Sequence, residues 1–170
     1  SYATEIRRSA LISANPHSNS VFRNRLSQNW ELDGEVGSDK DISRLYKYGK
    51  FNFVDPSDFG KFEELWKHSD DNYRYCPPRP VTDRGIKISR TENFERVILH
   101  YMPPHTPYSD EVIPANSNVP NNPIDYLKKT GDKKGVYEAY LNNLRWVLDD
   151  VKLLLNNTNY DDVVITADHG

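Results

Sequence analysis

The fold class is decided by the stretch Val136-Tyr-Glu-Ala-Tyr-Leu-Asn-Asn-Leu-Arg-Trp-Val-Leu-Asp-Asp-Val-Lys-Leu-Leu-Leu155. Its apolar residues recur at steps of three and four, which predicts a helix with one continuous apolar stripe. Apolar runs typical of strands flank it, Val97–Met102 before the helix and 162–167 after it. A strand, a long helix and a strand make a βαβ pattern. The sequence therefore predicts an α/β layered sandwich with a central, mostly parallel or mixed sheet.

Upstream of this pattern the sequence gives weaker signals. Ala10–Ala14 is predicted to be a short buried strand, and the alternation in 51–54 predicts another. A helix is expected over 59–67, with Ser57 or Asp58 as its cap.

Two long segments look like loop excursions from the core. Residues 68–93 are polar and rich in proline, and residues 109–134 are rich in Asn, Pro and Ser, with a short helical turn expected at 124–129. We interpret residues 1–170 as a single partial domain that is truncated at both ends.

The composition excludes several classes of protein. A net charge of −3 gives no basic surplus for nucleic acid, so no nucleic-acid partner is expected. No apolar run approaches the roughly 20 residues of a membrane helix, and no signal peptide is visible. The single cysteine, Cys76, is interpreted as an inert thiol, and together these features favour a cytoplasmic location. The sequence does not predict an oligomeric state.

The tripeptide Asp168-His169-Gly170 is the strongest candidate for chemistry. It directly follows a predicted strand, where ligands of open α/β sheets gather. Asp offers oxygen and His offers nitrogen, a fair start for a divalent cation. An ordinary turn at the end of a strand is the alternative interpretation.

His105 is the second candidate. It lies in Pro103-Pro-His-Thr-Pro-Tyr108, where prolines restrict the backbone. Such a histidine can hydrogen-bond an anion or protonate a leaving oxygen, or it can merely cap loop carbonyls. By contrast, His100 is interpreted as a core histidine of its strand, and His17 as a loop histidine without a role.

Together these elements resemble the alkaline phosphatase and sulfatase superfamily. The segment Phe94–Tyr108 is similar to the sulfatase strand that leads into a Pro-His-x-Pro-Tyr type loop, and Val163–Gly170 resembles the strand and Asp-His-Gly signature of the superfamily. Ala10–His17 looks like the early strand that follows the nucleophile region. Residues 20–93 match only loosely.

The resemblance implies a role for each matching residue. Asp168 and His169 would be metal ligands, with calcium, manganese or zinc as the divalent metal ion, and His105 would contact the sulfate or phosphate group or assist the leaving group. The family's Ser, Thr or formylglycine nucleophile lies upstream of this segment, so we expect the segment to be inactive alone.

The implied function is hydrolysis of sulfate or phosphate esters. Two alternatives stay open. One is a non-catalytic binding module that retains the fold, and the other is a phosphomutase or phosphotransferase of the same superfamily.

Overall fold

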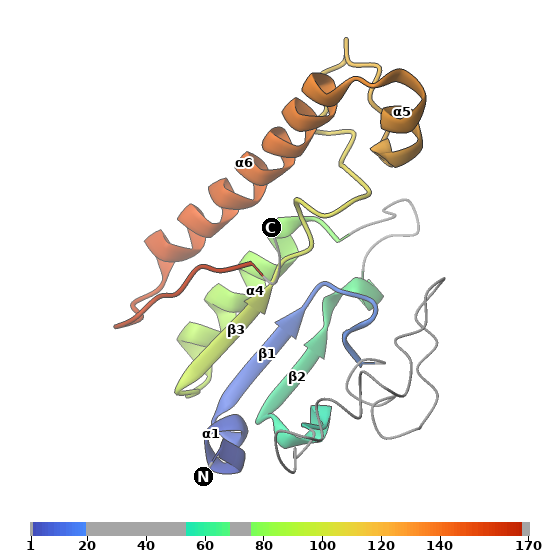
Figure 1. Ribbon diagram of the computed structural model, residues 1–170. Coiled ribbons are helices and arrows are strands. Elements are labelled where there is room, and N and C mark those ends of the chain that lie inside the picture. Colours follow the sequence, from blue (N-terminus) through green and yellow to red (C-terminus); the bar gives the residue numbers. More distant parts are fainter. Residues whose placement is uncertain (1, 20–53, 69–75, 168–170) are drawn as a thin grey trace, which may run out of the picture. The chain divides into compact units, whose positions relative to one another are not determined.

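The computed structural model describes residues 2–19, 54–68 and 76–167 (Figure 1). The chain divides into two units. The first contains Ser1–His68 and Phe94–His100, and the second contains Ser69–Asn93 and Tyr101–Gly170.

The first unit is built on a parallel sheet. Helix α1 (Tyr2–Arg7) leads into strand β1 (Ser9–Ser13), which lies between β2 (Lys61–Glu64) and β3 (Arg96–His100) (Figure 1). Both neighbours of β1 are parallel to it. Every residue of β1 is buried, as expected for the central strand of a sheet.

The sheet confirms part of the sequence prediction. The strands predicted at 10–14 and 97–102 are β1 and β3, each with slightly different bounds. The described residues form an α/β protein with three parallel strands and four α-helices. Of the strand predicted at 51–54, residues 51–53 lie outside the described residues, and Val54 is not in a strand.

The helix predicted over 59–67 was wrong. Its place is taken by β2 and by the short 3-10 helices η1 (Pro56–Asp58) and η2 (Leu65–His68), and Asp55 is the residue that caps η1. Gly60 explains the difference. Its N–H donates to the Ser9 carbonyl at 3.0 Å, and a Cβ at this position would lie 2.3 Å from the Arg7 carbonyl oxygen. The chain therefore joins the sheet at Gly60 instead of continuing as a helix.

The second unit is helical. It contains α4 (Pro78–Thr91), α5 (Pro123–Thr130) and α6 (Lys133–Asn157). Helix α4 corrects the loop expected over 68–93, and α5 is the helical turn expected at 124–129, within the other excursion. The prolines of this segment indicated a loop. Pro78 lies in the first turn of α4, where a backbone N–H has no partner within the helix, so proline is tolerated there.

Helix α6 confirms the helix predicted over 136–155, but its buried face differs from the predicted stripe. The buried residues form a row with helical spacing: Ala139, Asn143, Val147, Asp150 and Leu154. Tyr140, Leu148 and Leu155, which were expected in the core, are exposed. The two polar residues of this row have partners: Asp150 bonds to Arg79 and Thr82 of α4, which packs against α6, and the Asn143 side chain accepts from the Ser109 backbone N–H and donates to the Ala139 carbonyl.

The strand predicted for 162–167 was also wrong. No described residue of this segment is in a strand, and Val164 is 85% exposed. The segment is apolar, as the prediction assumed. A β-strand also needs a neighbouring strand to pair with, and the composition of a segment does not show whether one is present. Among the helices of the described ranges, none combines the length and the apolar character needed to cross a bilayer.

Candidate functional site

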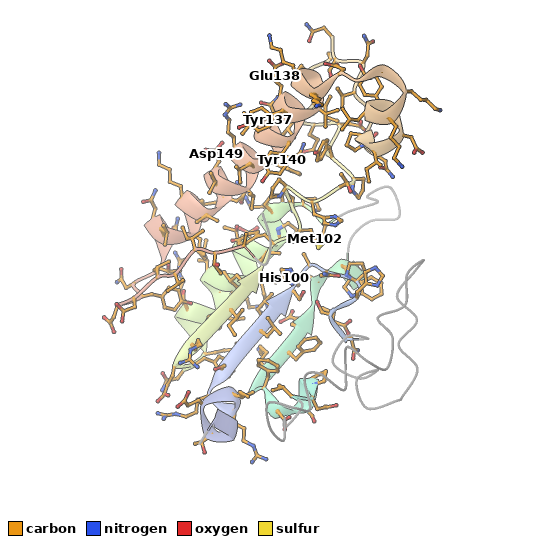
Figure 2. The ribbon with its side chains drawn as sticks, in the orientation of Figure 1. His100, Met102, Tyr137, Glu138, Tyr140 and Asp149 are labelled. Carbon is orange, nitrogen blue, oxygen red and sulfur yellow. The ribbon has the colours of Figure 1, made fainter. Side chains whose placement is uncertain are left out.

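Polar side chains end the three strands of the sheet. Ser13 is the last residue of β1, Glu64 of β2 and His100 of β3. Because the strands are parallel and in register, these residues lie at the same edge of the sheet. Figure 2 shows His100 at the carboxyl end of β3. Ligands of open α/β sheets bind beyond this edge, so it is the candidate functional site of the first unit.

Ser13 is the centre of a hydrogen-bond network at this edge. Its Oγ lies 3.0 Å from Nδ1 of His100 and 2.5 Å from Oγ of Ser18, and it accepts a hydrogen bond from the backbone N–H of Asn15 at 3.1 Å. The backbone N–H of Ala14 donates to the His100 carbonyl at 3.0 Å. The loop that follows β1 is therefore attached to the ends of both β1 and β3.

A second polar group lies at the end of β2. One carboxylate oxygen of Glu64 accepts a hydrogen bond from the Asn19 amide at 3.0 Å, and the other accepts one from the Trp66 indole at 3.1 Å. The amide oxygen of Asn19 is buried and has no hydrogen-bond partner in the described residues. The carboxyl edge thus combines hydroxyl, imidazole, amide and carboxylate groups.

His105 lies in the loop that follows β3, at the start of the second unit. Its imidazole is exposed, Nδ1 contacts the Thr106 carbonyl, and its backbone N–H donates to the Met102 carbonyl at 2.9 Å. The peptide bonds before Pro104 and Pro107 are both cis. The described geometry agrees with a histidine presented on a loop and also with one that contacts loop carbonyls, the two interpretations that the sequence left open.

Asp168 and His169 lie outside the described residues, so their role as metal ligands stays a prediction. Within the described ranges, no group of three or more His, Cys, Asp or Glu residues is placed to hold a metal ion. The ligand set implied by the resemblance is therefore not tested by the described geometry.

The other histidines differ from each other. His100, interpreted as a core histidine, is half-buried and bonded to Ser13. His17 is exposed, and its backbone N–H donates to the Asn15 side chain at 2.8 Å. Sequence reasoning missed Ser13 and Ser18. The available signal was the position of Ser13 at the end of an apolar strand, where a polar residue faces the ligand-binding edge of a sheet.

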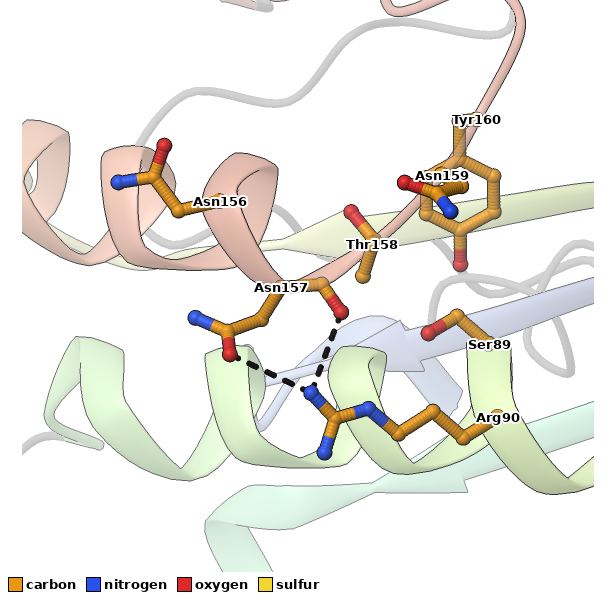
Figure 3. A pocket seen from close by; sticks show the side chains of 7 residues that line it. All are labelled: Ser89, Arg90, Asn156, Asn157, Thr158, Asn159 and Tyr160. Carbon is orange, nitrogen blue, oxygen red and sulfur yellow. Dashed lines mark hydrogen bonds between the residues drawn. The ribbon is translucent and has the colours of Figure 1, made fainter.

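A polar groove of about 390 Å³ lies where α4 and α6 end (Figure 3). Arg90 Nη2 donates to the Asn157 carbonyl at 3.4 Å and to its side-chain oxygen at 3.3 Å. The side chains of Asn157 and Thr158 donate to the carbonyls of Leu153 and Leu154, both at 2.8 Å. These bonds satisfy carbonyls in the last turn of α6, so capping explains the polar character of the groove.

An ion pair between a buried carboxylate and an exposed guanidinium joins the two packed helices of the second unit. The carboxylate of Asp150, on α6, accepts a hydrogen bond at 2.6 Å from the guanidinium of Arg79, on α4. Thr82 extends the contact, because its hydroxyl lies 2.9 Å from that of Tyr101 and donates to the Asp150 carbonyl at 3.5 Å. Burial raises the pKa of the Tyr101 hydroxyl, and the hydrogen bond with Thr82 opposes the rise. We read this cluster as structural.

Cys76 is buried near the start of α4. Burial raises the pKa of its thiol to about 11, so the thiol stays protonated at neutral pH. Because the thiolate is the reactive form, this environment supports the inert role expected for the cysteine.

Comparison of the chain with models of protein families, with curated proteins and with solved structures gave no match.

Proposed function

We propose that the protein is a metal-dependent hydrolase of sulfate or phosphate esters. The observation that carries the proposal is the carboxyl edge of the sheet, where β1, β2 and β3 end in Ser13, Glu64 and His100. In open α/β sheets, ligands bind beyond the carboxyl ends of the strands, and this supports a catalytic site at the edge where the polar groups lie. The chain also passes from β3 directly into the loop that carries His105.

In this proposal Asp168 and His169 bind a divalent cation through one oxygen and one nitrogen. Such a cation, when bound, stabilises negative charge on the ester oxygens and activates a nucleophile. Nitrogen ligation suits manganese or zinc better than calcium, and the choice among the three is part of the test. No residue of the chain is assigned as the nucleophile.

His105 contacts the oxyanion of the ester or gives a proton to the leaving oxygen. Its exposed imidazole supports this role, because a general acid must reach the substrate. Sulfate and phosphate esters share tetrahedral oxyanion geometry and differ mainly in charge, so both belong to the proposed substrate class.

The experiment is a hydrolysis assay of the complete protein with 4-nitrophenyl sulfate and 4-nitrophenyl phosphate, with and without each cation. We expect Asp168→Ala to abolish metal-dependent hydrolysis, because it removes a direct ligand. The matched control is Asp161→Ala, at an exposed acid seven positions upstream, which should leave hydrolysis unchanged. Full hydrolysis by Asp168→Ala would show that Asp168 is not a metal ligand, and it would contradict the proposal.

A further inference from the structure

The hydrogen bonds around Ser13 allow only two arrangements of protons. A serine hydroxyl has one proton to donate and two lone pairs that accept. The backbone N–H of Asn15 can only donate, so it occupies one lone pair of Ser13 Oγ. Ser18 and His100 remain as partners. One of them must donate to Ser13, and the other must accept the proton of Ser13.

In the first arrangement, the His100 ring carries a proton on Nδ1 and donates to Ser13, which donates to Ser18. The proton of Ser18 is then available to a further acceptor. In the second arrangement, Ser18 donates to Ser13, which donates to an unprotonated Nδ1 of His100. The proton of Ser18 is then used inside the network. The position of the His100 proton and the donor role of Ser18 are therefore coupled.

Burial keeps this coupling tight. Ser13 has no exposed surface, so water has little opportunity to replace its partners, whereas Ser18 keeps a small exposed fraction of 8%. Chains of hydrogen bonds in such surroundings polarise one another, which strengthens the arrangement that is favoured at either end. Glu64 is the charged residue at the end of the neighbouring strand. Its carboxylate already accepts hydrogen bonds from Asn19 and Trp66.

We propose that Ser18 is a ligand-binding hydroxyl that donates to an anionic oxygen, and that His100, acting through Ser13, is the positioning residue that makes Ser18 a donor. The ligand class is a tetrahedral oxyanion, the charged group of a sulfate or phosphate ester. The inference rests on the proposed function only for this choice of anion. Binding of the anion selects the first arrangement, with the His100 proton on Nδ1.

The test is nitrogen-15 NMR of the histidine side chains in the full chain, titrated with inorganic sulfate and, separately, inorganic phosphate. Sodium chloride at equal ionic strength is the control for screening. We expect sulfate or phosphate to increase the Nδ1-protonated form of His100. Ser57→Ala, which removes an exposed hydroxyl bonded to Asp55, should respond like the wild type. A His100 ring that responds equally to chloride, or to none of the anions, would overturn the proposal.

Substitutions at Ser18 give a second measurement. Ser18→Ala removes the donor and should weaken sulfate binding about tenfold, since a hydrogen bond to a charged group is worth roughly 1.5 kcal/mol or more. Ser18→Thr keeps a hydroxyl and should retain most of the affinity. Equal sulfate binding by Ser18→Ala and Ser18→Thr would contradict a ligand role for Ser18.

Neither readout requires a metal or turnover. A failed hydrolysis assay with an intact His100 response would reject the proposed function alone. An intact assay with no His100 response would reject only the role of Ser18.

Discussion

Ala10-Leu-Ile-Ser-Ala14 and Val163-Val-Ile-Thr-Ala167 are two apolar pentapeptides of nearly the same character, yet the protein uses them differently. The first supplies most of β1, has a parallel strand on each side and is buried. The second is outside any strand of the described chain and is exposed. A β-forming composition therefore identifies a segment that can become a strand, and neighbouring strands on both sides stabilise it as one.

The largest effect should come from the core of β1. Ile12 has no exposed surface, so Ile12→Ala should lower the free energy of unfolding by about 2 to 4 kcal/mol through lost burial and a cavity. Ile165→Ala, the matched change in the exposed segment, should cost less than about 0.5 kcal/mol. Urea denaturation measures both. Equal costs would mean that Val163–Ala167 is packed as firmly as β1.

The pH dependence of stability gives the next effect. The pKa of Cys76 is about 11 in the folded protein and 9.0 in a free thiol, so the folded state holds its proton more tightly. The resulting stabilisation is complete below pH 9 and is lost as the pH rises through 11, about 3 kcal/mol in all. Subtracting the pH profile of Cys76→Ala isolates this contribution. Parallel pH profiles of stability for the wild type and Cys76→Ala would contradict the burial of the thiol.

Two adjacent aspartates of α6 repeat the contrast between buried and exposed positions. Asp150 is 3% exposed and paired with Arg79, whereas Asp149 is exposed (Figure 2). Asp150→Asn should cost about 1 to 3 kcal/mol, because it weakens a charge-assisted bond at a buried position. Asp149→Asn should change stability by less than about 0.5 kcal/mol. Thermal unfolding of the pair measures the difference, and a reversed order would refute the packing of α4 on α6.

The smallest effect is expected at the end of α5. Gly131 has a φ of 70° and open space around its Cβ position, so only its backbone conformation opposes a side chain. Gly131→Ala should therefore cost about 1 kcal/mol. A gain in stability would show that the left-handed conformation is not required there.

Local pattern predicted the elements whose environment matches their composition. The strand at Ala10–Ala14 was found because its apolar residues are buried, and α6 was found because its apolar residues follow a clear period. The strand at Val97–Met102 was found from its apolar run, although none of the residues of β3 is fully buried. Helix α4 was missed because Thr82 and Gly85 occupy buried positions where apolar residues would reveal the period. Whether residues 162–167 form a strand depends on neighbouring strands, which the local sequence pattern does not show.

The candidate site, too, could be predicted from the sequence only in part. The sequence drew attention to His105 by its prolines, but Ser18 and Ser13 become notable only when β1 and β3 are side by side. Residues 9–13 and 96–100 are far apart in the sequence, so the hydrogen bond between Ser13 and His100 is a product of the topology. The roles of Asp168 and His169 rest on the resemblance and stay predictions.

The most direct test of the central claim, a metal-dependent site at Asp168 and His169, is isothermal titration calorimetry of the chain with manganese, zinc and calcium. We expect saturable binding of at least one cation, lost in Asp168→Ala and retained in Asp161→Ala. Identical titrations for the wild type and Asp168→Ala would contradict it.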